Sequence, residues 1–247
     1  MHKLKKPILG IIGGMGPSAS NLFYEMVISN TEATCDQDHI DMIILNHATM
    51  PDRTESILSG EIDVIKEKLK SDIRFLDSAG ISYLAVPCNT SHAILADIDM
   101  KGIVHINMIE EAAQRGKDIS ANGAVGIFAT EGTIQTELYQ RALNTLGITP
   151  VIPEKEVQKI ITSVIYDDIK KGGEGDMKAF GKAVAHMSKR DCNTVILGCT
   201  ELSVLRKQED LSFLEKENNI TFIDAMEVMA RKAVILTGRK PLEKKEY

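Results

Sequence analysis

The chain has 247 residues, which is enough for one large domain or two ordinary domains with a sizeable core. It is 43% hydrophobic and 26% charged, contains no tryptophan, and has a globular composition without a low-complexity tract. The formal net charge of −6 argues against nucleic acid as a partner, because phosphate binding needs clustered cations. No apolar run approaches transmembrane length, so we expect no membrane partner.

The amino terminus imitates a secretion signal. Lys3, Lys5 and Lys6 precede an apolar run at residues 8–12, but Gly13 interrupts this run. The apolar part of a signal peptide extends over about 7–15 residues. We therefore interpret residues 8–12 as a first strand that enters a glycine-rich turn, and we expect a cytoplasmic protein.

Apolar runs of strand length alternate with longer segments of helical period, which predicts parallel sheets covered by helices. We expect strands at residues 8–12, 42–46, 83–86, 103–106, 124–129, 148–152, 194–197 and 221–223. We expect the clearest helices at residues 18–30, 61–79, 154–170, 176–189 and 224–237, and further helices after Cys88, after the fourth strand and up to residue 146. Residues 47–53 are predicted as a polar loop.

The order of elements repeats at about half the chain. Residues 8–12 align with residues 124–128 in the sequence at an offset of 116 residues, and the same offset aligns Gly16 with Gly132. This pattern predicts an internal duplication. The expected fold is α/β, with two pseudo-symmetric lobes, each a four-stranded, mainly parallel sheet flanked by helices, and an active site in the cleft between them. We expect the first lobe at residues 1–115 plus 225–247 and the second at residues 116–224.

The four cysteines are Cys35, Cys88, Cys192 and Cys199. None has the spacing of a zinc site, so we expect no metal, and in a reducing cytoplasm free thiols are expected. We interpret Cys35 and Cys192 as small buried hydrophobic residues. Cys88 and Cys199 differ from them, because each stands with polar neighbours where a predicted strand ends, and such strand ends bind ligands in α/β proteins.

A thiol at a helix start can have its pKa lowered from about 8.5 to about 3.5–7.5. One such thiol indicates a nucleophile, for which His92, four residues after Cys88, is the nearby base. Two equivalent thiols across a cleft indicate instead that one removes a proton from carbon and the other returns a proton on the opposite face. The result is inversion of a stereocentre. Asn89, Thr90 and Thr200 can donate to a substrate carboxylate or cap the following helices.

Four motifs occur in order: Gly-Gly-Met-Gly-Pro at residues 13–17, Met-Pro-Asp-Arg at 50–53, Pro-Cys-Asn-Thr at 87–90 and Gly-Cys-Thr-Glu at 198–201. Together they resemble the aspartate/glutamate racemase superfamily, which works without pyridoxal phosphate. The first two motifs resemble its aspartate racemase branch. Glu201 favours the same branch, because glutamate racemases typically carry histidine there. The likeness spans nearly the whole chain.

The resemblance implies a proton shuttle between Cys88 and Cys199 across Cα of an acidic amino acid, with no cofactor. It also implies that Arg53 binds a substrate carboxylate, which suits the bidentate pairing of arginine with carboxylates. Lys170 resembles the lysine that helps with the second carboxylate, although a cation at a helix C-terminus is the alternative. Thr130 can donate to the substrate or simply form a turn. The expected partner is a dicarboxylic amino acid, and the sequence leaves the oligomeric state open, a homodimer included.

Several alternatives stay open. A broad-specificity amino-acid racemase is the nearest, followed by a hydantoin racemase, a maleate isomerase or a decarboxylase on a related scaffold. From other classes, a two-lobed solute-binding protein would bind its ligand without turnover, and a redox or metal-binding protein would respond to chelators. The paired thiols favour catalysis over these.

Overall fold

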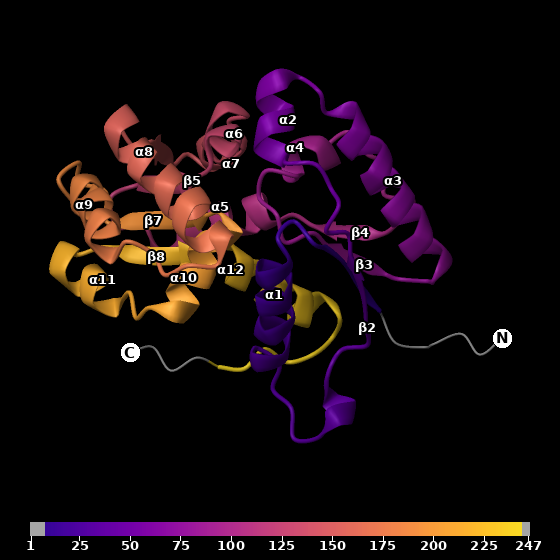
Figure 1. Ribbon diagram of the computed structural model, residues 1–247. Helices are drawn as coiled ribbons and strands as arrows, with labels where there is room; N and C mark the ends of the chain where they lie inside the picture. The colour runs from indigo at the N-terminus through magenta and orange to yellow at the C-terminus, as the bar shows by residue number, and fades with distance from the viewer. Residues whose placement is uncertain (1–7, 244–247) are drawn as a thin grey trace.

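The computed structural model describes residues 8–243, which form two α/β lobes with the sheets inside and the helices outside (Figure 1). The basic part of the signal-like pattern lies outside the described residues, because it consists of Lys3, Lys5 and Lys6. No helix in the described part of the chain is long and apolar enough to cross a membrane.

Each lobe is built on a four-stranded parallel sheet. The first sheet has the order β2-β1-β3-β4, with β1 (Leu9–Gly13), β2 (Met42–Asn46), β3 (Tyr83–Ala85) and β4 (Val104–Ile106). The second has the order β6-β5-β7-β8, with β5 (Ala124–Ala129), β6 (Thr149–Val151), β7 (Thr194–Gly198) and β8 (Thr221–Asp224). The two orders are equivalent strand by strand, which confirms the predicted pair of pseudo-symmetric lobes. The sheets are parallel throughout.

Helices cover both sheets. Those of the first half are α1 (Pro17–Ser29), α2 (Arg53–Ser59), α3 (Asp63–Ser78), α4 (His92–Leu95) and α5 (Met108–Ile119). Those of the second half are α6 (Glu131–Gln135), α7 (Leu138–Thr145), α8 (Lys155–Ser163), α9 (Met177–Ser188), α10 (Thr200–Gln208), α11 (Ser212–Asn218) and α12 (Ala225–Leu236). Short turns are η1 (Asp36–Asp38), η2 (Val164–Asp168) and η3 (Ile169–Lys171).

The two lobes share one hydrophobic cluster at the centre of the molecule. Ile11 of β1, Ile127 of β5 and Met229 of α12 all belong to it and are fully buried. Helix α5 packs against α12, α7, β7 and β8, and α12 also packs against α1. Helix α5 therefore follows the first sheet in the chain but rests on the second. The division at residues 1–115 plus 225–247 and 116–224 stays a proposal.

The loops at the carboxyl ends of the first sheet touch one another closely. Gly14 has a φ of +92°, and a Cβ there would lie 2.4 Å from the carbonyl carbon of His47. Only glycine tolerates both conditions. The His47 N–H donates to the Gly13 carbonyl at 3.1 Å. The glycine-rich turn after β1 therefore supports the loop after β2, which leads to Arg53.

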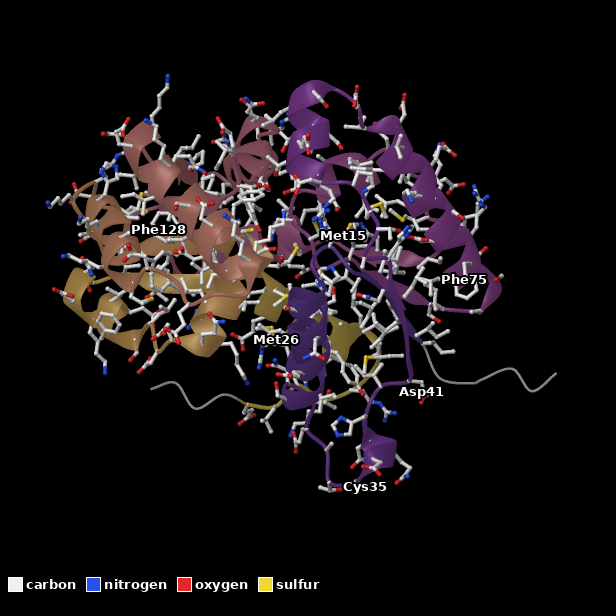
Figure 2. The ribbon with its side chains drawn as sticks, viewed as in Figure 1. Met15, Met26, Cys35, Asp41, Phe75 and Phe128 are labelled. Carbon is white, nitrogen blue, oxygen red and sulfur yellow. The ribbon has the colours of Figure 1, made fainter. Side chains whose placement is uncertain are left out.

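Some local predictions need correction. The predicted loop at residues 47–53 ends in a helix, because the Asp52 carboxylate accepts from the Glu55 N–H and caps α2. The predicted helix 154–170 changes at Val164 into the π-helical turn η2 and then into η3. The helix after Cys88 is a single turn, α4. Cys192 is buried as expected, but Cys35 is exposed in a loop at the edge of the molecule (Figure 2).

Candidate active site

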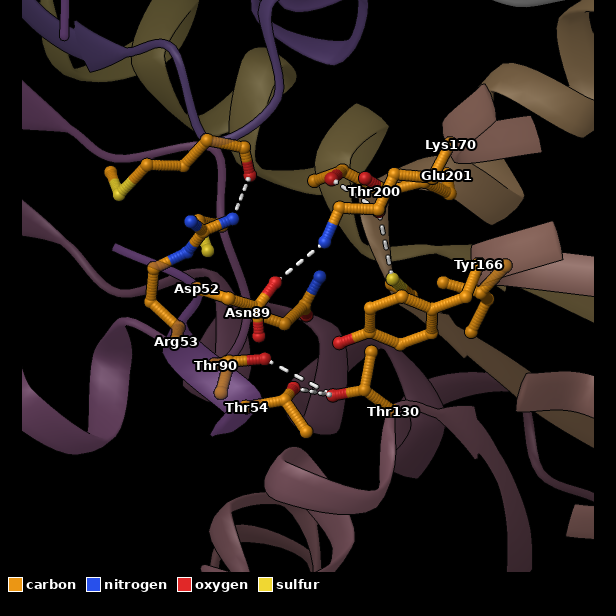
Figure 3. A pocket seen from close by; sticks show the side chains of 14 residues that line it. Asp52, Arg53, Thr54, Asn89, Thr90, Thr130, Tyr166, Lys170, Thr200 and Glu201 are labelled. Atoms are coloured by element: carbon orange, nitrogen blue, oxygen red, sulfur yellow. Dashed lines mark hydrogen bonds and ion pairs between the residues drawn. The ribbon is translucent and has the colours of Figure 1, made fainter. Parts of the chain in front are cut away.

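One pocket at the carboxyl ends of both sheets brings together all eight side chains that the sequence predicts for the site (Figure 3). They are Arg53, Cys88, Asn89, Thr90, Thr130, Lys170, Cys199 and Thr200. The free cavity among them is about 20 Å³, room for about one water molecule. An amino acid therefore enters only when the lobes or the pocket side chains move apart.

A larger cavity, of about 640 Å³, lies behind the pocket between α5 and α7. No cysteine lines it, and its Lys232 already pairs with Glu111 at 2.9 Å. Size therefore does not identify the site here. The smaller pocket holds both thiols and two cations, so it is the candidate active site.

The Cys88 side of the pocket carries a buried positive charge. Cys88 lies in a turn after β3 and is 6% exposed. The Arg53 guanidinium donates to the carbonyl oxygens of Pro51 at 2.8 Å and Met15 at 3.0 Å. Burial alone would lower the pKa of Arg53, but its charge interaction and hydrogen bond with Cys88 raise that pKa. Arg53 is thus a fixed cation beside the Cys88 sulfur, and its buried Nε has no hydrogen-bond partner within residues 8–243.

The Cys199 side of the pocket carries a carboxylate instead. Cys199 directly follows β7 and is the N-cap residue of α10. Its thiol donates to Glu201 Oε2 at 2.9 Å, and the Thr200 hydroxyl donates to the same oxygen at 3.1 Å. Burial, followed by the charge and hydrogen bond of Glu201, raises the pKa of Cys199 well above its ordinary value. The prediction of a lowered thiol pKa at a helix start is therefore wrong for Cys199, because burial and Glu201 outweigh the helix.

Polar side chains after Cys88 reach across to the second lobe. Asn89 Oδ1 accepts from the Tyr139 hydroxyl, while the buried Asn89 Nδ2 has no partner among the described residues. Thr90 Oγ1 lies 2.9 Å from Thr133 Oγ1 and 3.2 Å from Thr130 Oγ1. Asn89 therefore offers an open donor, because an unsatisfied buried N–H gains most from an incoming acceptor. The threonines instead connect the two lobes.

Lys170 closes the pocket from the second lobe. Its ammonium pairs with Asp52 Oδ2 at 2.7 Å and lies 4.3 Å from the centre of the Tyr166 ring (Figure 3). Burial opposes ionisation of Asp52, but the Lys170 hydrogen bond, joined by the Glu55 N–H and the charges of Lys170 and Arg53, lowers its pKa. Tyr166 belongs to the turn η2, and turns of this π-helical type are frequent at functional sites.

Six lining residues were not predicted for the site: Met15, Asp52, Thr54, Ile165, Tyr166 and Glu201. Asp52 and Glu201 belong to the motifs at residues 50–53 and 198–201, so the motifs could have indicated them. Thr54 and Tyr166 gave no signal in the sequence, because their place depends on contact between lobes. Thr54 Oγ1 lies 3.3 Å from Thr130 Oγ1, and burial raises the pKa of Tyr166 to about 12.

His92 is absent from the residues that line this pocket. Its ring nitrogens face backbone atoms of Cys88 and Met108 instead. It is therefore placed wrongly to serve as a base for the Cys88 thiol. Within residues 8–243, no three His, Cys, Asp or Glu side chains are grouped as a metal ion would require.

Solved structures share this fold. The aspartate racemase of Picrophilus torridus is 29% identical, with a TM-score of 0.79, and the comparison covers 96% of each chain. An aspartate racemase homologue from Pyrococcus horikoshii OT3 is 22% identical, with a TM-score of 0.73 over 94% of this chain and 99% of that chain. The latter similarity shows the fold alone.

Curated relatives extend the comparison. The broad specificity amino-acid racemase RacX of Bacillus subtilis is 25% identical over 231 residues, which are 92% of this chain and 96% of RacX. A glutamate racemase of Desulforudis audaxviator is 28% identical over 151 residues, so the match spans about half of that relative, 53%. The family model described as Asp/Glu/hydantoin racemase matches residues 12–233. This chain therefore belongs to the Asp/Glu/hydantoin racemase family of isomerases.

Proposed function

We propose that this chain interconverts L- and D-aspartate without a cofactor, with Cys88 and Cys199 as the two acid–base groups. The observation that carries the proposal is that both thiols line one pocket that also contains a cation from each lobe, Arg53 and Lys170. Two cations suit the two carboxylates of aspartate. The similarity to an aspartate racemase over 96% of the chain supports the same substrate.

In the proposed mechanism the two cysteines begin in different protonation states. In this proposal Cys88, which lies beside the Arg53 guanidinium, acts first as the base, and Cys199, whose thiol donates to Glu201, acts as the acid. The Cys88 thiolate takes the Cα proton, and Cys199 delivers its proton to the opposite face of Cα. The product is the other enantiomer, and the reverse reaction exchanges the two roles. Glu201 is placed to pass a proton to or from Cys199 between turnovers.

The Cα–H of an amino acid is a very weak acid, so the site must stabilise the carbanion. Oriented donors in a water-excluded site do this at little reorganisation cost. Asn89 Nδ2 and Arg53 Nε are buried donors that have no hydrogen-bond partner in the described part of the chain, and both belong to residues that line the pocket. We assign them to a substrate carboxylate, with the hydroxyls of Thr90, Thr130 and Thr200 around it.

Lys170 takes the second carboxylate in this proposal. In this structure the Lys170 ammonium pairs with the Asp52 carboxylate. The substrate carboxylate, which has the same charge, takes the place of Asp52 as its partner. A substrate that lacks the second carboxylate would leave the Lys170–Asp52 pair intact and would gain no contact with Lys170. The exchange therefore favours dicarboxylic substrates. Movement of Lys170 and the lobes would also open the closed cavity, and their return would exclude water.

A broad-specificity amino-acid racemase is the second candidate, because RacX matches this chain over nearly its full length. It would accept apolar amino acids that do not engage Lys170. A cytoplasmic location stays a prediction, as does a homodimer.

The test is incubation of L-aspartate with the protein in heavy water without added cofactor. We expect deuterium at Cα and formation of D-aspartate until the enantiomers are equal. Absence of both would refute the aspartate assignment. Parallel reactions with L-glutamate, L-alanine and L-lysine separate the two candidates, because turnover of lysine comparable to that of aspartate would favour broad specificity.

A further inference from the structure

His92 is a buried histidine whose two ring nitrogens both contact the backbone. It is 4% exposed, with Nδ1 3.0 Å from the Cys88 carbonyl oxygen and Nε2 3.3 Å from the Met108 nitrogen. A carbonyl oxygen only accepts and an amide N–H only donates, so these partners assign the proton to Nδ1. His92 therefore donates to Cys88 and accepts from Met108 at the same time.

The imidazole is uncharged in this position. Burial, followed by the neighbouring His105, lowers the pKa of His92 to about 3. The two rings lie 5.1 Å apart between their centres. With both nitrogens occupied and no charge, His92 has no capacity left to accept a proton from a thiol.

The two backbone groups that His92 joins belong to different parts of the site. The Cys88 carbonyl lies in the irregular segment between β3 and α4. The Met108 N–H is the first of α5, and such N–H groups have no partner within their helix. Asn107 caps the next two N–H groups, those of Ile109 and Glu110. His92 thus completes the cap of α5 while it holds the cysteine turn.

Helix α5 extends this connection to the other cysteine. It packs against β7, and β7 ends at Gly198, directly before Cys199. A chain of direct contacts therefore leads from the Cys88 carbonyl through His92 and α5 to the strand that carries Cys199. Like the contacts that Asn89 and Thr90 make with the second lobe, this chain of contacts helps to define the position of one sulfur relative to the other.

We infer that His92 is a positioning residue that fixes the Cys88 turn against α5 and thereby sets the place of the Cys88 sulfur relative to Cys199. The inference rests on the proposed function only in supposing that both cysteines act on one substrate. It assigns His92 no contact with the substrate.

Two conservative substitutions separate the two hydrogen bonds. The amide nitrogen of asparagine can take the place of Nδ1, so His92→Asn keeps the bond to Cys88 and loses that to Met108. The longer side chain in His92→Gln reaches the place of Nε2 and keeps the bond to Met108. His92→Phe keeps an aromatic ring and loses both hydrogen bonds.

A displacement of about 1 Å at a reacting group can cost about 100-fold in rate. We therefore expect kcat to fall about 10-fold in the Asn and Gln variants and about 100-fold in the Phe variant, with KM within about twofold.

The matched control is His105→Phe. His105 stacks on His92 and belongs to the same lobe, but it has no hydrogen bond to Cys88. We expect its kcat and KM to stay within about twofold of the unmodified protein, because aromatic packing is retained.

A second measurement needs no substrate. Alkylation of the folded protein by iodoacetamide, followed by peptide mapping, gives separate rates for Cys88 and Cys199. We expect Cys88 to react about threefold or more slowly in His92→Gln and His92→Phe, since its sulfur leaves the neighbourhood of Arg53, while Cys199 keeps its rate. The alkylation rates test the positioning role of His92 even if aspartate proves to be the wrong substrate.

Two results would overturn the inference. One is unchanged kcat and unchanged Cys88 alkylation in both the Gln and Phe variants. The other is an equal change at both cysteines together with a raised KM, which would indicate general loosening of the lobes. If His92→Phe does not fold, the Asn and Gln variants still give the answer, because each retains one of the two bonds.

Discussion

The turns at Cys88 and Cys199 occupy equivalent places in two sheets of the same strand order, yet opposite charges surround their sulfurs. Cys88 has the Arg53 guanidinium beside it, whereas Cys199 donates to the Glu201 carboxylate. The repeated backbone therefore does not make the two thiols alike. In the proposed mechanism, the fold supplies two facing positions, and the neighbouring side chains decide which thiol starts as the base and which as the acid.

The backbone around the two cysteines also differs. Cys199 is the N-cap residue of α10, a helix of nine residues. Cys88 precedes a helix of only four residues, α4, and His92 ties its carbonyl to α5. A short helix offers fewer hydrogen bonds to hold a preceding turn, so a side chain takes over that task at Cys88.

The largest expected effect comes from removing either thiol. Positioned acid–base groups contribute about 10²–10⁴-fold, so Cys88→Ser and Cys199→Ser should each lose about 10³-fold or more in racemisation. Deuterium exchange without inversion should then persist for one enantiomer only, because the remaining thiol faces one side of Cα. The two variants should retain exchange on opposite enantiomers. Exchange of the same enantiomer by both would contradict the comparison.

The next effect concerns Glu201. In Glu201→Gln the negative charge beside Cys199 is lost, so the pKa of Cys199 should fall towards its ordinary value, although burial still raises it. The pH at which Cys199 becomes reactive to iodoacetamide should therefore move down. Racemisation should fall about 10-fold, because the carboxylate that passes a proton to and from Cys199 is lost. The alkylation profile of Cys88 serves as the internal reference, and an upward shift for Cys199 would refute the assigned role.

The smallest effect on kcat concerns the cation of the second lobe. Lys170→Met removes the proposed partner of the second carboxylate, and a charge-assisted hydrogen bond is worth about 1.5–3 kcal/mol. We expect KM for aspartate to rise about 10-fold or more, with kcat changed less. Lys171→Met is the matched control, because Lys171 is exposed and pairs with Asp167, four residues earlier in the chain. Equal changes in both variants would mean that Lys170 acts as an ordinary surface charge.

The strand ends could be predicted because they depend on local sequence. Apolar runs form buried parallel strands, and glycine is required where Gly14 approaches His47. Because parallel strands align their carboxyl ends, motifs that follow equivalent strands meet in one place. This is why Cys88, Cys199 and the other six predicted residues line one pocket.

The sequence by itself thus determined the fold class, the repeat and the set of polar residues at the strand ends. Tertiary structure alone decided what surrounds each thiol: Glu201 rather than a bare helix start at Cys199, and Tyr166 and Thr54 brought in by contact between lobes. It also showed that His92, a candidate base only for a single nucleophilic thiol, instead contacts the backbone at Cys88 and Met108. The physical reason is that burial and pairwise charges depend on distances through space, which residue spacing along the chain does not specify.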